Sequence, residues 1–325
     1  MAPSPRTVVK LFLVAIIAAL PFIVVSLTPW AALSGVVLLG LMPLLGIATA
    51  GVRAMATTGA VAAVVSMLAV LLTGTGALLP WLGTALVLVL ALLASPLVKI
   101  GRASTGAIII VLAVYIMAAP SGPVSAVIDG PLAMDAVVLG LLVAASCAWT
   151  IAVVGVILRR SEIPKHHAAQ PTMPYTTLLA VLAGIFTFVT LTWFPGTNAW
   201  WSVLTVAVIL QPTGAHMREK LFARVAGTVL GGAVALAAVL WLPPMLVTVL
   251  GAAAGLATVI TMLMGIAYWI YASALTVTIV LTSFTPQDAV AGDILRVGIT
   301  LGTAVVTAVA AVIAARFMRT PSSGR

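Results

Sequence analysis

The sequence predicts an all-α integral membrane protein with about twelve transmembrane helices. Hydrophobic residues make up 63% of the 325 positions and charged residues only 6%, whereas a soluble domain carries about 25% charged residues. The apolar runs approach the roughly 20 residues with which a helix crosses the hydrocarbon core. They are too long for barrel strands and lack the alternation of apolar and polar residues that such strands require. Helices are therefore the expected spanning elements.

Twelve apolar segments follow one another along the chain in two groups of six. The first group comprises residues 11–27, 31–51, 55–73, 81–97, 105–119 and 137–158. The second group comprises residues 175–194, 197–212, 223–242, 245–264, 266–283 and 295–315. Arg6 and Lys10 before the first run resemble the start of a signal peptide. Because no cleavage pattern is clear before Trp30, we expect this run to remain as the first span.

The only long polar stretch, RRSEIPKHHAAQPTMP, lies between the two groups. It predicts four parts of the chain: a first six-helix repeat at 1–158, a cytoplasmic linker at 159–174, a second six-helix repeat at 175–316 and a cytoplasmic tail at 317–325. Because each group holds an even number of spans, both begin on the same side of the membrane. The repeats are therefore expected to be parallel, related by an axis along the membrane normal.

The two groups also share an order of residues. The first contains, in sequence, Trp30, Pro43, Arg53 and Thr57, and the second contains Trp200, Pro212, Arg224 and Thr228. Acidic pairs precede the last span of each group: Asp129 with Asp135, and Asp288 with Asp293. Apolar sequences resemble one another by chance, but the matching order of these less common residues indicates an internal duplication.

The basic residues predict the orientation in the membrane. Of the fifteen Lys and Arg residues, all but Arg296 fall at the termini or in loops that share one face of a twelve-span protein. The positive-inside rule makes this face cytoplasmic, with both termini inside, and we expect an inner or plasma membrane location. The net charge of +9 is thus explained by membrane topology, and nucleic acid is not an expected partner.

A motif in the second half resembles a known family. A Trp-led segment ends at Gln211-Pro212, and the next helix opens with Arg224-Val-Ala-Gly227-Thr228-Val-Leu-Gly231. This pattern resembles the fusaric-acid-resistance-like (FUSC) family, which is related to bacterial aromatic acid exporters. The first half keeps Arg53 and Thr57 but has Ala56 and Ala60 in place of the glycines.

The resemblance implies an inner-membrane protein that exports aromatic or other amphipathic organic acids. Larger members of the family carry a soluble cytoplasmic domain between or after their six-helix units. Residues 159–174 leave no room for such a domain between the two halves of this chain.

Residues from both halves form the predicted substrate path. Arg224 and Arg53 are the predicted anion-binding groups, accompanied by Thr228 and Thr57. The alternative role for Arg224 is an interfacial topology anchor that extends to the headgroups or pairs with Glu219. Matching interrupted segments are a sequence pointer to a transporter binding site, so we add Pro43, Pro212, Gln211 and Thr205. Trp200 and Trp201 are predicted either to stack on an aromatic substrate or to form the outer aromatic belt.

Three further groups of residues complete the prediction. His216, Arg218 and Lys220 are expected to collect anions at the cytoplasmic mouth. Gly227 with Gly231 and Gly298 with Gly302 are expected to let neighbouring helices approach closely. Asp288, Asp293 and Arg296 form a predicted acidic and ion-pair group on the outer face. No carboxylate, lysine or histidine is predicted near the middle of a span, which argues against a proton-coupled antiporter.

The sequence offers no sign of catalysis. It contains no Walker-type phosphate-binding run, and neither a nucleophile with an adjacent base nor paired carboxylates can be identified. His166 and His167 have no spaced partners that would complete a metal site, and the single Cys147 is predicted to be a small buried hydrophobic residue. We therefore predict a protein that is not an enzyme and that has neither a cofactor nor a metal ion.

Two functions remain open at this stage. The first is efflux of amphipathic or aromatic organic acids, with a basic cytoplasmic mouth and Pro-broken helices along the path. The second is a non-transporting membrane scaffold or assembly partner in the cell envelope. The expected partners are the lipid bilayer, a small organic anion, and either a second copy of the chain or a periplasmic adaptor.

Overall fold

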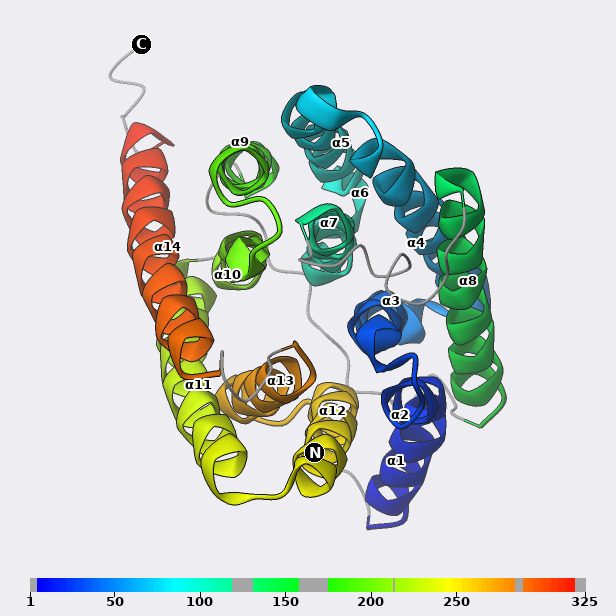
Figure 1. Cartoon of the computed structure of the whole chain (residues 1–325). Helices are drawn as coiled ribbons and strands as arrows, with labels where there is room; N and C mark the ends of the chain where they lie inside the picture. The colour runs from blue at the N-terminus through cyan, green and yellow to red at the C-terminus, as the bar shows by residue number, and fades with distance from the viewer. Residues whose placement is uncertain (1–4, 119–130, 158–174, 213, 284–288, 319–325) are drawn as a thin grey trace.

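The computed structural model describes residues 5–118, 131–157, 175–212, 214–283 and 289–318. Within these ranges all of the regular structure is helical, and the helices lie roughly side by side in one bundle (Figure 1). The helical class predicted from the apolar runs is therefore confirmed for the described residues. Three predictions fall outside these ranges. They concern the acidic pair member Asp129, the outer acid Asp288 and the linker at 159–174.

The helices of the first half follow the predicted segments closely. They are α1 (Pro5–Ala18), α2 (Leu20–Ser26), η1 (Ala31–Leu33), α3 (Ser34–Ile47), η2 (Ala48–Ala50), α4 (Val52–Thr73), η3 (Gly76–Leu78), α5 (Leu79–Leu93), α6 (Ser95–Lys99), α7 (Ala103–Ala118) and α8 (Leu132–Ile157). Proline occupies a first-turn position in α2, α5 and α6, where its missing N–H would have no intrahelical partner in any case.

The second half contains α9 (Tyr175–Trp193), η4 (Asn198–Trp200), α10 (Trp201–Ile209), α11 (Gly214–Trp241), α12 (Pro244–Met264), α13 (Tyr268–Ser283) and α14 (Ala289–Met318). Gly265 ends α12 in the left-handed conformation, at φ 64°, a conformation that glycine adopts without steric penalty. The short connections between α11, α12 and α13 make successive helices run in opposite directions.

The prediction of about twelve spans is confirmed only in part. Seven described helices are long and apolar enough to cross a membrane, and an eighth is added if α1 and α2, which are bent by 44° at their junction, count as one span. The four other predicted spans form apolar helices of 10–17 residues at Ala31–Ile47, Ala103–Ala118, Asn198–Ile209 and Tyr268–Thr282. These helices fall short of the roughly 20 residues that the hydrocarbon core requires.

The short helices lie in the interior of the bundle. Figure 1 shows α3, α7, α10 and α13 surrounded by longer helices, and nearly every side chain of α3, α7 and α10 is buried. A helix that contacts protein on all sides has no hydrophobic length to match to lipid, so its length is set by the packing around it. Apolar composition does not distinguish such a helix from a lipid-facing one.

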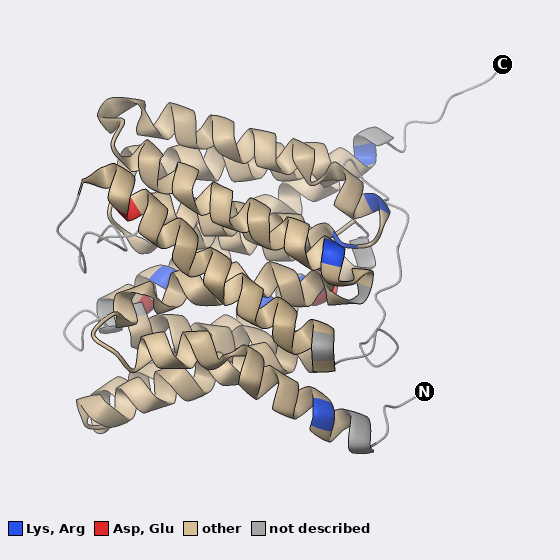
Figure 2. Cartoon of the chain, turned by 90° about the vertical axis from the view of Figure 1, so that its right-hand side faces the viewer, with Lys and Arg blue, Asp and Glu red and all other residues tan. Residues whose placement is uncertain are grey.

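The two halves of the chain are packed together through matching helices. Helix α5 of the first half packs against α9, the first helix of the second half, and α1 packs against α12. Within the halves, α4 contacts α7 and α8, and α11 contacts α13 and α14. Figure 2 shows that α1 begins and α14 ends at the same end of the bundle, where most of the described Lys and Arg residues also lie.

Candidate functional site: a charged cluster inside the bundle

Helix α11 carries a row of residues, most of them polar, into the bundle. His216, Lys220, Arg224, Thr228 and Gly232 are spaced by four residues, so each lies next to the following one on the helix surface, and the row winds gradually around the helix because one turn takes 3.6 residues. Exposure decreases along this row: His216 is exposed, Lys220 is half-buried, Arg224 is 3% exposed and Thr228 is 1% exposed. The row therefore leads from one end of the helix into the protein interior.

Arg224 is the buried cation of this row. Its Nε and Nη1 atoms have no hydrogen-bond partner in the described structure, and its charge acts on Tyr268 and Tyr271 of α13. Glu219 is exposed and acts on Lys220, whose Nζ lies 4.0 Å from the centroid of the Tyr268 ring. The described residues show no ion pair between Arg224 and Glu219. The alternative role as an interfacial anchor is therefore not supported, because an anchor would lie at the end of the helix.

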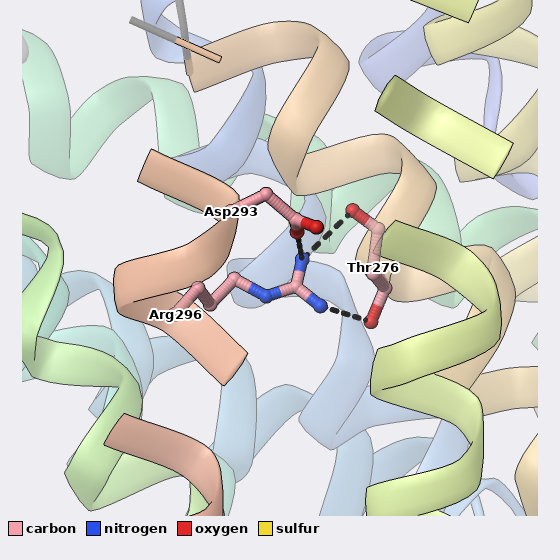
Figure 3. Close-up of polar contacts among 3 residues, drawn as sticks. All are labelled: Thr276, Asp293 and Arg296. Atoms are coloured by element: carbon pink, nitrogen blue, oxygen red, sulfur yellow. Dashed lines mark hydrogen bonds and ion pairs between the residues drawn. The ribbon is translucent and has the colours of Figure 1, made fainter. Parts of the chain in front are cut away.

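A second buried arginine, Arg296 of α14, is held by α13 (Figure 3). Its Nη1 donates to the carbonyl oxygen of Thr276 at 3.3 Å and its Nη2 donates to the Thr276 hydroxyl at 2.7 Å. Its guanidinium carbon lies 5.2 Å from the centroid of the Trp201 ring. Arg296 is 3% exposed and lies within electrostatic reach of Arg224. The structure therefore brings two cations from different helices into one interior region.

Asp293 provides a carboxylate beside Arg296. The Oδ1 atom of Asp293 lies 4.0 Å from Nη1 of Arg296 and has no hydrogen-bond partner in the described structure. The carboxylate occupies the space next to Gly232, the last residue of the α11 row, where any Cβ would collide with it. Asp293 was predicted as an outer acid, and it is buried within the bundle at 8% exposure.

Three buried threonines surround the same region. Thr205, Thr228 and Thr300 follow Trp201, Arg224 and Arg296 by one helical turn, and their hydroxyl groups have no hydrogen-bond partner in the described structure. Their helices, α10, α11 and α14, contact one another. The cluster thus combines unsatisfied hydroxyls with unsatisfied guanidinium donors.

The arrangement favours binding of an anion. Two guanidinium groups and one carboxylate leave an excess of one positive charge among the buried residues Arg224, Arg296 and Asp293. A buried cation without a partner is strongly unfavourable, and ionisable groups inside a membrane bundle usually serve a function. A carboxylate is a strong hydrogen-bond acceptor for guanidinium groups, so an anion of this type suits the cluster.

The two predicted glycine pairs differ in their surroundings. A Cβ at Gly227 would collide with Ala272 and with the backbone of Trp269, and a Cβ at Gly231 would collide with Ser273 and Thr276. These glycines therefore let α11 pack directly on α13. Gly298 and Gly302 have no atom within 4 Å of an added Cβ, so in the described structure this second pair packs against no helix.

The first-half counterparts of the motif are not part of the cluster. Arg53 is the second residue of α4 and is exposed, and the exposed Thr57 donates its hydroxyl to the Arg53 carbonyl oxygen. By contrast, Arg224 lies ten residues beyond the first residue of α11, about 15 Å along its axis. In the described structure the cluster therefore contains Arg224 and not Arg53.

The two prolines also behave differently from each other. Helix α10 ends at Ile209, shortly before Pro212, but Pro43 lies inside α3, which continues to Ile47. Gln211 donates its Nε2 to the Val208 carbonyl oxygen at 2.8 Å, so this side chain satisfies the end of its own helix. His216 and Arg218 are exposed at the beginning of α11, as expected of residues at a mouth.

The two tryptophans are buried, which excludes an aromatic belt that faces headgroups. Trp200 and Trp201 are each 1% exposed, with ring centroids 5.7 Å apart. Trp201 faces Arg296, and Trp200 packs edge-on against Tyr115 at 4.8 Å. Trp200 also lines a small cavity. Its other walls come from α2, α3, α7 and α13, including Phe22, Gly35, Tyr115 and Leu275.

Sequence reasoning missed several members of the cluster. Thr300, Gly232, Tyr268, Tyr271 and Thr276 were not assigned to the path. The four-residue spacing from His216 to Gly232 could have extended the prediction along α11. No sequence signal links Arg296 to Thr276, because the two residues lie on different helices.

The long apolar helices define the class of the protein: it is a multi-pass α-helical membrane protein. Residues 182–317 match the family described as fusaric acid resistance protein-like. The resemblance predicted from the Arg224–Gly231 motif is thereby confirmed. The matched residues include every member of the cluster. No curated protein and no solved structure matches the chain.

Proposed function

We propose that the chain is a transport protein that exports amphipathic, aromatic organic acids across the inner or plasma membrane. The observation that carries this proposal is the burial of Arg224 at 3% exposure with two of its guanidinium nitrogens unpartnered. In a bundle that spans a membrane, such a cation needs an anion. A substrate carboxylate that enters the bundle would supply it.

The neighbours of the arginines favour an aromatic substrate. Tyr268 and Tyr271 lie near Arg224, and Trp201 lies against Arg296. Aromatic rings pack well against one another in offset or edge-to-face arrangements. A substrate with a carboxylate at one end and a ring at the other would therefore satisfy both the charge and the walls of the site.

The row on α11 supports a route from the basic end of the bundle. We assign this end to the cytoplasm on the basis of the positive-inside rule, with both termini on that side. An anion attracted by His216, Arg218 and Lys220 would meet Arg224 one helical turn beyond Lys220. From the cluster, the buried pair of Trp201 and Trp200 leads toward the cavity between α2, α3, α7 and α13.

The helix pairs support an internal repeat as the framework of the transporter. The four short apolar helices are the second and fifth segments of each half, and α5 packs on α9 as α1 packs on α12. We propose that two six-helix repeats at 1–158 and 175–316 surround the path. The charges of the cluster lie in the second repeat alone, which explains why the first half can depart from the motif.

The test is accumulation of a panel of radiolabelled aromatic carboxylates in cells that lack the protein. The cells are complemented with wild type, Arg224→Gln or Arg53→Gln at matched membrane expression. We expect wild type and Arg53→Gln to lower accumulation of at least one compound, and Arg224→Gln to fail. Equal export by Arg224→Gln and wild type would remove the proposed role of the buried arginine.

One observation favours the scaffold as a second candidate function. The exposed Gly298 and Gly302 on α14 leave a small-residue face against which nothing packs in the described structure, and such faces suit close association of membrane helices. The partners to test at this face of α14 are a second copy of the chain and a periplasmic adaptor. If wild-type cells accumulate every compound like cells with the empty vector, the scaffold function becomes the better candidate.

A further inference from the structure

We infer that Asp293 determines the charge of the substrate: the site takes aromatic acids with one carboxylate and rejects those with two. The inference rests on the proposed transport function and narrows its substrate class. It gives Asp293 a role in specificity, because this carboxylate balances one of the two buried arginines and leaves the other for the ligand.

The two arginines differ in their charge balance. The Oδ1 atom of Asp293 lies 4.0 Å from Nη1 of Arg296, close enough for the opposite charges to stabilise each other. Arg224 forms no ion pair with an acid of the described residues, and its Nε and Nη1 atoms have no hydrogen-bond partner there. The cluster therefore contains one cation that is balanced and one that is open to a ligand.

The carboxylate of Asp293 lies about two helical turns from Arg224. It occupies the space next to Gly232, which follows Arg224 by eight residues, about 12 Å along α11. The ring of Trp201 lies against Arg296 and can pack on an aromatic ligand. A substrate whose carboxylate pairs with Arg224 would extend its ring toward Arg296. A second carboxylate on that ring would meet an arginine that Asp293 already balances.

No other acid of the described helices around α14 contributes to this balance. Helices α9 and α10 and the η4 turn, which pack against α14, carry no Asp or Glu, and neither does α13. The acid of α11 is Glu219, which is exposed near the beginning of that helix. Asp293 therefore leaves the cluster with one excess positive charge, which one substrate carboxylate neutralises. A second carboxylate would make the buried cluster negative, which is strongly unfavourable.

Arg296 is held in place independently of Asp293. Its Nη1 and Nη2 atoms donate to the carbonyl and hydroxyl oxygens of Thr276 at 3.3 and 2.7 Å (Figure 3). Replacement of Asp293 by asparagine removes the negative charge and nearly preserves the shape of the side chain. This variant therefore has two open cations in the cluster, which suit the two carboxylates of a benzenedicarboxylate.

The test measures binding of matched ligands by purified full-length protein in lipid nanodiscs. Labelled isophthalate and terephthalate are the dicarboxylates, and 3-carbamoylbenzoate and 4-carbamoylbenzoate are their monovalent counterparts. A carboxamide has nearly the shape of a carboxylate without its charge, so each pair of ligands isolates one charge. Equilibrium dialysis at neutral pH gives the ratio of the two affinities within each pair.

We expect wild type to bind the monovalent member of at least one pair about tenfold more tightly, because like charges placed together in a buried site oppose binding. Asp293→Asn should reverse this preference, and Asp293→Glu, which retains the charge, should keep it. The matched control is Asp135→Asn, which should also keep it. Asp135 is buried near the beginning of α8 with an unpartnered Oδ1, but α8 packs against α1, α3 and α4.

Several outcomes would overturn the role of Asp293. They are equal affinities in wild type, an unchanged preference in Asp293→Asn, and a reversed preference in Asp293→Glu or Asp135→Asn. Loss of all binding in both the Asn and the Glu variants of Asp293 also overturns it, because the carboxylate would then serve packing alone.

Exchange of the labelled monovalent acids by the same protein in liposomes tests transport separately. Wild type that shows the preference in binding but no exchange contradicts the transport function and supports the selection by charge. Wild type that binds and exchanges both members of each pair equally supports transport and overturns the selection. Wild type that binds none of the four ligands contradicts both proposals.

Discussion

The carboxylate of Asp293 on α14 lies against the bare Cα of Gly232 on α11, in the space where any side chain at residue 232 would begin. This contact joins the row of polar residues on α11 to the ion pair of Asp293 with Arg296. It also explains why the buried acid can fit between two closely packed helices. Both residues lie within the part of the chain that matches the fusaric acid resistance protein-like family.

Gly232→Ala should destabilise the protein by displacing Asp293. Overpacking a close contact typically costs about 1–3 kcal/mol, and the displaced carboxylate would also lose its ion pair. Thermal unfolding of the purified protein in detergent measures this effect. Gly298→Ala is the matched control, because an added Cβ there meets no atom within 4 Å. Equal stability of the two variants would show that the α11–α14 contact is loose.

Gly227→Val should separate α11 from α13. The added side chain would collide with Ala272 and with the backbone of Trp269, and backbone atoms cannot move aside as a flexible side chain can. We expect a lower unfolding temperature and a loss of export. Gly302→Val on the open face of α14 should retain both properties. If Gly302→Val is the more harmful variant, that face is covered in the functional protein.

Thr276→Val should destabilise the protein by leaving the Nη2 atom of Arg296 without its closest acceptor. The two side chains have nearly the same shape, so the change isolates the hydrogen bond at 2.7 Å. Leaving a buried charged donor unsatisfied costs about 1–3 kcal/mol. Thr248→Val is the control, because the exposed Thr248 hydroxyl donates only to its own helix, at the Pro244 carbonyl. An unfolding temperature for Thr276→Val equal to that of the control would argue against this bond.

Trp201→Leu should reduce both stability and export, since Trp201 is 1% exposed and its ring faces Arg296. Truncating a buried tryptophan costs about 3–5 kcal/mol when alanine replaces it, and leucine should cost less. Trp241→Leu at 81% exposure is the control. Export in cells and thermal unfolding of the same two variants measure the effect. Normal export by Trp201→Leu would exclude the ring from the path.

Labelling of introduced cysteines should reveal the orientation. Cys147 is 2% exposed, so we expect it to remain unlabelled by a membrane-impermeant maleimide in folded protein and to serve as the background. Arg218→Cys, at the exposed beginning of α11, should react only after the cells are opened. Ala77→Cys, exposed in the η3 turn at the opposite end, should react in intact cells. The reverse pattern would invert the proposed direction of transport.

The sequence predicted the parts of the structure that depend on local composition. Apolar runs located the helices, because every backbone polar group in a lipid environment must be paired within its own segment. The polar beginnings of two helices were missed: α11 begins nine residues and α14 six residues before the predicted segment. The motif from Arg224 to Gly231 identified the family, since its residues lie on one continuous helix. The predicted packing position of Gly227 and Gly231 also followed from helical spacing alone.

What the sequence alone determined is therefore the class of the protein: an α-helical membrane protein with its basic residues on one side and a recognisable family motif. The tertiary structure alone decided which helices lie in the interior, that Arg53 faces outward while Arg224 is buried, and that Asp293 and Arg296 pair within the bundle. The physical reason is that apolar composition is the same for a helix that faces lipid and one that faces protein. Burial of a charge depends on contacts between residues far apart in the chain, such as Arg296 and Thr276.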